Sequence, residues 1–196
     1  MKSIELYYDY RSPFAYFASQ RLDLFQGTPI HWKPVSVSGL INLQVDRDPR
    51  SEVVDPLCPA KRNHFMADIF RLIGYWKIPF APPNPTPPIC NTAMAISAKL
   101  AADGVEHDAF RSAIFASVWQ KQQDAESEAV LRECLEGANL DPDLARTATQ
   151  EGEEILFANT QLAFKKGVFG TPSFIYNDEL YFGADRMELL AASLNV

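Results

Sequence analysis

The first 35 residues constrain the fold most strongly, because a strand, a helix and a second strand follow one another closely. Residues 4–8 alternate in character and include aromatic side chains, which is typical of a strand. Ser12 suits a helix N-cap, and Pro13 suits the first helical position, where the missing N–H of proline costs nothing. Apolar residues follow at helical spacing up to Phe25, and residues 30–35 are typical of a second strand. A right-handed crossover makes these two strands parallel.

The middle of the chain has a different pattern. Its periodicity is helical from about residue 59 to residue 166, apart from a proline-rich connector. The helices predicted there span residues 61–75, 91–102, 106–121, 126–136 and 141–166. The chain then ends with two short strands around Asn177-Asp178 and a helix from Asp185. We therefore predict an α/β fold of order β-α-β, all-helical insertion, β-β-α, with one domain in residues 1–55 and 167–196 and an inserted helical domain in residues 56–166.

Composition and charge exclude several classes of function. Of the 196 residues, 47% are hydrophobic and 22% are charged, as in a globular domain with a full core. The net charge of -7 argues against nucleic acid or an anionic membrane as the main partner. We see no signal peptide and no apolar run near the roughly 20 residues of a membrane span, so we expect a cytoplasmic protein. The cysteines (Cys58, Cys90 and Cys134) and the three histidines lack motif spacing, which predicts no structural disulfide and no metal site.

Four stretches, taken together, resemble a known family. They are residues 8–16, which read Tyr-Asp-Tyr-Arg-Ser-Pro-Phe-Ala-Tyr; Lys61 with Asp68 and Arg71; residues 167–172; and residues 182–186, which read Phe-Gly-Ala-Asp-Arg. They resemble the 2-hydroxychromene-2-carboxylate isomerases and the kappa-class glutathione transferases, in the DsbA-like branch of the thioredoxin superfamily. The resemblance implies a thioredoxin-like fold in which the first helix start faces a cis-proline loop at Thr171-Pro172.

Within that fold, Ser12 stands where redox enzymes carry the first cysteine of Cys-x-x-Cys. No second cysteine accompanies the position, so we reject a disulfide oxidoreductase. The resemblance implies instead that Ser12 is catalytic and binds the thiolate of glutathione as cofactor. A helix start favours an anion by up to about 2 kcal/mol and lowers the pKa of a nearby thiol. The backbone of Thr171-Pro172 is then expected to pair with the cysteinyl part of glutathione.

The resemblance also implies partners for both ends of glutathione. Ala184, Asp185 and Arg186 are expected at the γ-glutamyl end. The alternative for Asp185, which we favour less, is a helix cap, and a solvated or salt-bridged side chain explains Arg186 equally well. Lys61 is expected at the glycyl carboxylate or at a substrate carboxylate. The candidates for the substrate side are Phe14, Tyr16, Lys33 and Asn91, and core packing explains Phe14 and Tyr16 nearly as well. This chain departs from the family at residues 52–58, where members often have an Asn, and at Phe65, where they often have Tyr.

These residues lead to one main functional hypothesis and two alternatives. The main hypothesis is a glutathione-dependent isomerase that converts 2-hydroxychromene-2-carboxylate to trans-o-hydroxybenzylidenepyruvate in aromatic degradation. The alternatives are a kappa-like transferase, which consumes glutathione, and a redox-inactive module that binds extended peptides. Kappa-type relatives further imply a homodimer.

Overall fold

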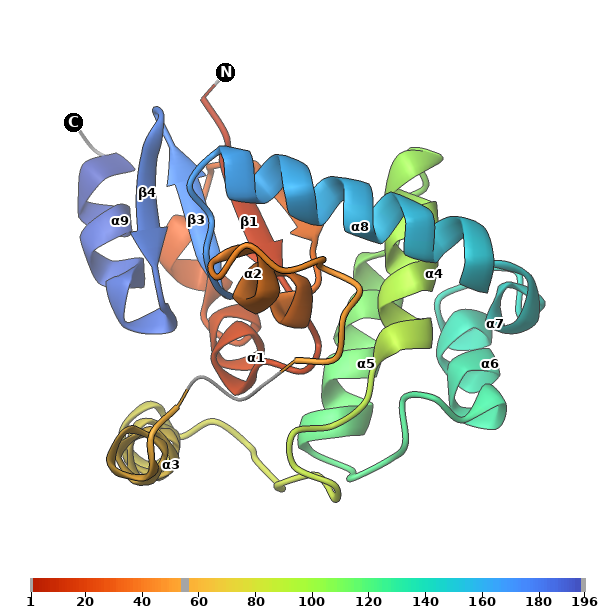
Figure 1. Ribbon diagram of the computed structural model, residues 1–196, viewed down its shortest axis with the longest axis horizontal. Coiled ribbons are helices and arrows are strands. Elements are labelled where there is room, and N and C mark those ends of the chain that lie inside the picture. The colour runs from red at the N-terminus through yellow and green to blue at the C-terminus, as the bar shows by residue number, and fades with distance from the viewer. Residues whose placement is uncertain (1, 54–56, 195–196) are drawn as a thin grey trace.

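The computed structural model describes residues 2–53 and 57–194, and its centre is a four-stranded mixed sheet of order β2-β1-β3-β4 (Figure 1). The strands are β1 (Ile4–Tyr8), β2 (Ile30–Pro34), β3 (Ser173–Tyr176) and β4 (Glu179–Phe182). β1 runs parallel to β2 and antiparallel to β3, and β3 pairs with β4 in a hairpin. Asn177 and Asp178 both have positive φ angles, of 51° and 65°, as a two-residue hairpin turn requires.

Helices follow the predicted order. They are α1 (Pro13–Ser19), α2 (Val37–Leu43), α3 (Pro59–Trp76), α4 (Asn91–Ala102), α5 (Asp108–Trp119), α6 (Glu128–Gly137), α7 (Leu144–Thr147), α8 (Thr149–Lys165) and α9 (Met187–Leu194). Two 3-10 turns, η1 (Leu22–Phe25) and η2 (Ala184–Arg186), precede β2 and α9. The described residues thus form the predicted thioredoxin-like α/β fold with a large helical insertion.

Helix α8 joins the insertion to the sheet. It crosses above the strands and continues over α4 (Figure 1). Near its end, Ala163 packs with Tyr7 and Val35 on one face of the sheet. Farther back, Gly152 lies so close to α4 that an added Cβ would stand 2.2 Å from the carbonyl oxygen of Ala95. The other face of the sheet carries the main core, which includes Phe174 and extends among the inserted helices.

Helix α3 is the most solvent-exposed long helix among the described residues. Of its described side chains, only Ile69 is buried, and Figure 1 shows the helix set apart from the sheet. Contacts near both of its ends attach it to the body, and Phe70, Leu72 and Ile73 pack between them. The ring of Phe65 meets that of Phe14 edge-on at 4.9 Å between centroids. At the other end, the guanidinium of Arg21 lies 3.9 Å from the centre of the Trp76 ring.

The structure differs from the predicted elements in three places. The spacing of apolar residues predicted a first helix up to Phe25, but α1 ends at Ser19 and η1 is a separate 3-10 turn. The single helix predicted over residues 141–166 is divided at Ala148 into α7 and α8. Helix α2 was not predicted, because it has only seven residues and includes Gly39, which weakens the periodicity. Its signal was Ser36, whose Oγ accepts a hydrogen bond from the N–H of Gly39 at 3.0 Å. The predicted boundary between residues 55 and 56 lies outside the described residues and stays a prediction.

Candidate active site

Ser12 forms the centre of the candidate site. Its φ and ψ are extended, and its Oγ accepts a hydrogen bond from the N–H of Ala15 at 3.2 Å, so it is the N-cap of α1. The same hydroxyl donates to the carbonyl oxygen of Thr171 at 2.9 Å. Pro13 occupies the first helical position, as predicted. A side-chain hydroxyl and the positive end of α1 therefore coincide, which is an arrangement that favours an anion.

Thr171 lies directly across from Ser12, just before β3. The Thr171-Pro172 peptide is cis, which confirms the prediction for this bond. Thr171 is 7% exposed, and among the described residues its buried Oγ1 has no hydrogen-bond partner. The carbonyl of Pro172 accepts from the N–H of Gly183 at 2.9 Å. This bond holds the end of β4, and the η2 turn that follows it, beside the proline loop.

The η2 turn brings the predicted γ-glutamyl residues to that side. Gly183 has a φ of 102°, and a Cβ there would stand 2.4 Å from Asp185 Oδ1, so glycine is required. Ala184 is buried, and its carbonyl accepts from Arg21 Nη1 at 3.2 Å. The side chains of Asp185 and Arg186 are each 55% exposed and are paired at 3.1 Å. Arg186 also lines an open depression on the outer side of β4 and α9.

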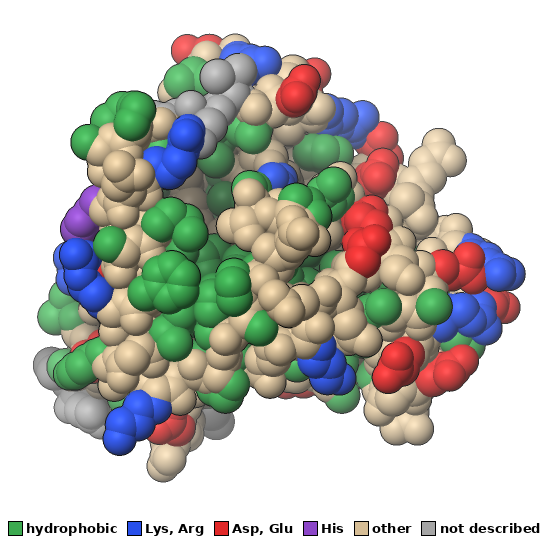
Figure 2. Space-filling model, turned by 90° about the horizontal axis from the view of Figure 1, so that it is seen from below, with side chains coloured by type: hydrophobic (Ala, Val, Ile, Leu, Met, Phe, Trp, Pro, Cys, Tyr) green, Lys and Arg blue, Asp and Glu red, His purple; other side chains and the backbone are tan. Residues whose placement is uncertain are grey.

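Helix α3 supplies a side wall of the candidate site. Phe65 is in contact with Phe14, which belongs to the first turn of α1. Lys61 is exposed and precedes Phe65 by four residues, so both lie on one face of α3. Figure 2 shows hydrophobic side chains gathered in a hollowed part of the face seen from below. Aromatic contacts between α1, α3 and the connector after α3 join Phe65, Phe14, Phe17, Phe80 and Phe70.

Two charged residues, the buried Asp9 and the partly exposed Arg11, precede Ser12 in the chain. Asp9 is 2% exposed, and its two carboxylate oxygens accept from the N–H groups of Arg11 at 2.9 Å and Val37 at 2.8 Å. Burial raises the pKa of Asp9, while the Arg11 charge and the two backbone bonds act in the opposite direction. The guanidinium of Arg11 donates to Ser38 Oγ in the first turn of α2. Both residues belong to the stretch of residues 8–16, but the sequence alone assigned a role to neither.

Two predicted substrate residues are not brought to Ser12. Tyr16 is fully buried, and its hydroxyl donates to the Pro79 carbonyl and accepts from Gln120 Nε2 at 3.0 Å. Positions two apart on a helix point to different sides, so Tyr16 packs in the core while Phe14 faces α3. Lys33 lies in the edge strand β2, opposite Tyr7 of β1, and its charge helps to lower the pKa of Glu5. We therefore leave Tyr16 and Lys33 out of the site.

The remaining predictions are placed as follows. Asn91 is exposed at the start of α4, directly after Cys90. Burial raises the pKa of the Cys90 thiol, the Asp9 charge raises it further, and the Arg11 charge opposes both. The first turns of α4 lie close to the segment that precedes Ser12, because the N–H of Tyr10 donates to Met94 Sδ at 3.4 Å. The family position for Asn falls in residues 52–58, of which 54–56 lie outside the described residues.

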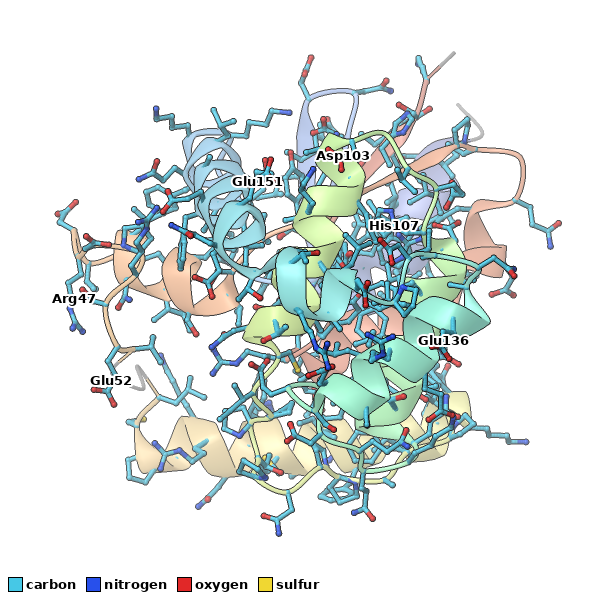
Figure 3. The ribbon with its side chains drawn as sticks, turned by 90° about the vertical axis from the view of Figure 1, so that its right-hand side faces the viewer. Arg47, Glu52, Asp103, His107, Glu136 and Glu151 are labelled. Carbon is cyan, nitrogen blue, oxygen red and sulfur yellow. The ribbon has the colours of Figure 1, made fainter. Side chains whose placement is uncertain are left out.

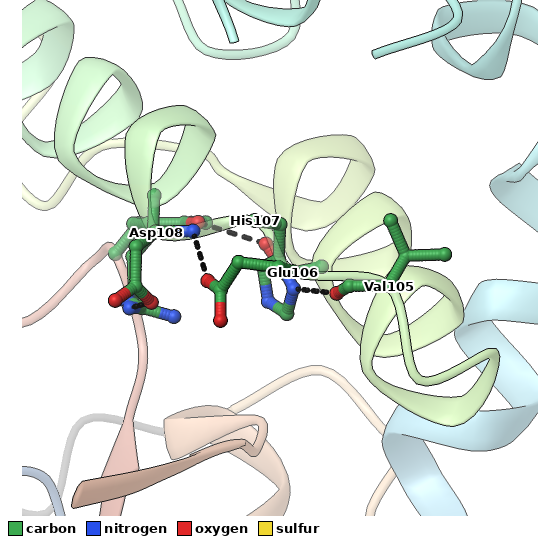
Figure 4. A network of polar contacts seen from close by, with 7 residues as sticks. Val105, Glu106, His107 and Asp108 are labelled. Atoms are coloured by element: carbon green, nitrogen blue, oxygen red, sulfur yellow. Dashed lines mark hydrogen bonds and ion pairs between the residues drawn. The ribbon is translucent and has the colours of Figure 1, made fainter. Parts of the chain in front are cut away.

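Histidine and cysteine do not form a metal centre in the part of the chain that the structure describes. Figure 3 shows His107 apart from Asp103 and Glu151, which both pair with Lys99 Nζ, at 2.6 and 3.7 Å. His107 precedes α5, and its Nδ1 is 2.8 Å from the carbonyl oxygen of Val105, while Glu106 Oε1 accepts from the Asp108 N–H at 2.9 Å (Figure 4). This network therefore belongs to the turn before α5. Across the described segments, no helix is both long and apolar enough to span a membrane.

Comparison with known proteins identifies the family to which the chain belongs. The family model of the DSBA-like thioredoxin domain matches residues 3–195. The chain belongs to this family. It is also 30% identical to a 2-hydroxychromene-2-carboxylate isomerase of Sphingobium xenophagum over 98% of both chains. A protein of the same name from Pseudomonas sp. (strain C18) is 27% identical over 95% of this chain and 87% of its own length. These relatives support an enzyme of the isomerase type.

Solved structures show the same DSBA-like fold. A 2-hydroxychromene-2-carboxylate isomerase superposes with a TM-score of 0.81 at 20% identity, covering 98% of this chain and 94% of that chain. The cytosolic disulfide reductase DsbM of Pseudomonas aeruginosa, solved with GSH, superposes with a TM-score of 0.63 at 16% identity, covering 99% and 100%. A single DSBA-like fold therefore includes proteins named as isomerases and as disulfide reductases.

The residues around Ser12 fit glutathione in charge and in donor type. The thiol end would meet the Ser12 hydroxyl at the start of α1, and the unpartnered Thr171 Oγ1 offers a further polar group. Lys61 offers a cation for a carboxylate, and the exposed Asp185 offers an anion for the ammonium. Ala184 and Asp185 are held beside the proline loop by the bond between Gly183 and Pro172.

Proposed function

We propose that this protein is a glutathione-dependent isomerase that interconverts 2-hydroxychromene-2-carboxylate and trans-o-hydroxybenzylidenepyruvate. The observation that carries the proposal is the Ser12 hydroxyl, placed at the start of α1 against the Thr171 carbonyl. Redox members of the fold have a thiol at that position. A hydroxyl there cannot exchange disulfides, but it can donate a hydrogen bond to the thiolate of a bound molecule. Two relatives of nearly the same length carry the isomerase name.

Glutathione supplies, when bound, a thiol that adds reversibly to an electrophilic carbon and permits rotation about a former double bond. The chain contributes the environment for this chemistry. Ser12 would turn its hydroxyl from Thr171 to the thiolate, and the partial positive charge at the N-terminus of α1 would favour the ionised form. Each unit by which the thiol pKa falls corresponds to about 1.4 kcal/mol of preferential binding of the thiolate.

Binding and orientation would come from the walls of the site. Lys61 would bind the glycyl carboxylate, and Ala184 with Asp185 would bind the γ-glutamyl end. Phe14 and Phe65, whose rings are in contact, would face an aromatic substrate. Holding both reactants in one orientation is itself a large source of rate acceleration. A homodimer and a cytoplasmic location remain further proposals, taken from the family resemblance.

Calorimetry with glutathione tests the thiolate site. We expect binding in the micromolar to low-millimolar range, with release of a proton that is lost or reduced in Ser12→Ala. Ser36→Ala is the matched control, because Ser36 caps α2 in the same way but does not contact Thr171 in the structure. Undetectable binding to the wild-type protein would contradict the proposal and favour the peptide-binding module.

A second assay separates the isomerase from the transferase. Substrate conversion is followed by its absorbance while free thiol is counted with a thiol reagent. An isomerase returns every glutathione molecule, so the thiol count stays constant while the substrate is converted. A fall in free thiol that matches the substrate consumed would identify a kappa-like transferase instead.

A further inference from the structure

Arg11 holds a cation directly beside Ser12. Its backbone N–H is bonded to Asp9, and its guanidinium reaches the first turn of α2, where it donates to Ser38 Oγ. The residue is only partly exposed, and its Nε is buried without a hydrogen-bond partner among the described residues. The backbone bond to Asp9 fixes the start of the side chain, and the contact with Ser38 fixes its end.

This cation has unused binding capacity. Asp9 is the nearby carboxylate and its charge attracts that of Arg11, but its two oxygens accept hydrogen bonds from the backbone N–H groups of Arg11 and Val37 and not from the guanidinium. Within residues 2–53 and 57–194, no ion pair joins the Arg11 guanidinium to a carboxylate. A guanidinium carries several N–H donors in one plane and binds a carboxylate through two parallel hydrogen bonds. A partly buried guanidinium with an unpartnered donor is therefore suited to an anionic ligand.

The surroundings of Ser12 restrict what kind of anion can bind there. Arg11 is followed by Ser12 and then, after Pro13, by Phe14, whose ring meets that of Phe65 on α3. A cation and an aromatic pair thus flank the Ser12 hydroxyl along a single stretch of chain. A ligand that fills this space would carry a carboxylate at one end and an aromatic ring at the other.

We propose that Arg11 is a specificity-determining residue that binds the carboxylate of the aromatic substrate, while Phe14 and Phe65 contact its ring. This inference rests on the proposed function, since it places the substrate beside a thiol held by Ser12. Lys61 and Arg11 then bind different molecules: Lys61 binds the glycyl carboxylate of glutathione, and Arg11 binds the carboxylate of the substrate. Arg11 thereby selects an aromatic carboxylate over a neutral electrophile of the same shape.

Binding of two matched probes tests this role. The probes are 2-hydroxycinnamate and its uncharged amide, titrated by calorimetry with and without glutathione. We expect the wild-type protein to bind the acid at least about tenfold more tightly than the amide, which is typical for a charge-assisted contact. Arg11→Leu should reduce this ratio to about one, and Arg11→Lys should keep part of it. Arg47→Leu is the control, because Arg47 is an exposed arginine whose Nη2 donates to the Glu52 carbonyl.

The outcomes distinguish this inference from the proposed function. Glutathione affinity within about twofold of wild type in Arg11→Leu, with the acid preference lost, supports the assignment. A wild-type protein without acid preference, or an Arg11→Leu variant that retains it, would overturn it. If Arg11→Leu does not fold, the assignment is tested by the ratio of acid affinity to amide affinity in the wild type and in Arg11→Lys. A third result would contradict the proposed function alone. In it, the protein binds no glutathione but still prefers the acid to the amide, and Arg11→Leu removes that preference.

Discussion

The hydroxyl of Ser12 donates a hydrogen bond to the carbonyl oxygen of Thr171 at 2.9 Å, which joins residues separated by 159 positions. The same oxygen of Ser12 accepts from the N–H of Ala15. Ser12 therefore links the start of α1 to the loop before β3. Its hydroxyl hydrogen can serve either the Thr171 carbonyl or a bound thiolate, so ligand binding exchanges one acceptor for another.

Replacing Ser12 by alanine should reduce turnover by about one to three orders of magnitude, as the loss of one stabilising donor does in other enzymes. The free energy of unfolding should fall by only about 1 kcal/mol, the usual cost of a lost N-cap. Steady-state kinetics and denaturant unfolding measure the two effects. Turnover equal to that of the wild type would remove Ser12 from the mechanism.

Arg21 should be important for the attachment of α3. Its guanidinium lies over Trp76, donates to the Ala184 carbonyl at 3.2 Å and pairs with Glu188. Arg21→Met should lower the free energy of unfolding by about 1–3 kcal/mol, because a mostly buried cation–π contact and a hydrogen bond are lost.

Arg21→Lys is the informative companion variant, since an ammonium group cannot stack on Trp76 while keeping the same fork of donors. It should recover only part of the loss. Limited proteolysis should also cut within α3 faster in Arg21→Met than in the wild type. Equal unfolding free energies and equal cleavage rates would show that α3 is held by other contacts.

Two glycines in long helices should respond oppositely to alanine. Gly152 of α8 faces the backbone of Ala95, and an added Cβ would force α4 and α8 apart. Gly152→Ala should therefore destabilise the protein by about 2–4 kcal/mol. Gly74 of α3 has nothing within 4 Å of the corresponding position, so Gly74→Ala should stabilise the helix by about 0.5–1 kcal/mol. Thermal or urea unfolding measures both, and a tolerated Gly152→Ala would contradict the packing of α4 against α8.

His107 should make stability depend on pH. Burial lowers its pKa below the ordinary value of 6.5 and the Arg111 charge lowers it further, while the hydrogen bond to the Val105 carbonyl and the Glu106 charge act in the opposite direction. The folded state therefore favours the neutral ring, while the unfolded state takes up a proton as the pH falls below about 6.5. The contribution of His107 is complete above that pH and is lost as the pH falls toward its folded pKa.

His107→Asn isolates this effect, because the amide Nδ2 can replace Nδ1 as the donor to the Val105 carbonyl. Unfolding free energies should be measured from pH 8 to pH 5 in both proteins. The wild type should lose stability more steeply than the variant between pH 6.5 and 5, by at most the slope of one proton. Parallel curves would show that His107 does not change its protonation on unfolding.

Much of the architecture was predictable from local patterns. Helix α4 begins and ends at the predicted residues, and Ser12 caps α1 with Pro13 after it, because capping and periodicity depend on near neighbours. The break at Ala148 and the short helix α2 were not predicted. Helix α2 packs against α8, and α7 packs against α4 and α6. These contacts join segments that are distant in the chain, so they leave little trace in the local sequence.

Site residues that belong to a recognised motif were predicted from the sequence. Residues whose roles depend on packing in the folded chain were not. Ser12 and Thr171-Pro172 lie together, as the motifs predicted, but Phe14 and Tyr16 proved to face different environments. Their spacing did not reveal which of the two would face the core. Arg11 and Asp9 stood in the quoted motif, yet their roles depend on Ser38 and Val37, which reach them only in the folded chain.

The amino-acid sequence by itself determined the order of strands and helices, the cap at Ser12 and the absence of a second cysteine beside it, because these depend on residue identity and short-range spacing. Only the tertiary structure decided that the Ser12 hydroxyl meets the Thr171 carbonyl, that Tyr16 is buried while Phe14 faces α3, and that Arg11 keeps an unpartnered donor beside the site. The physical reason is that hydrogen bonding, burial and charge pairing depend on distances in space, and folding brings distant segments within those distances.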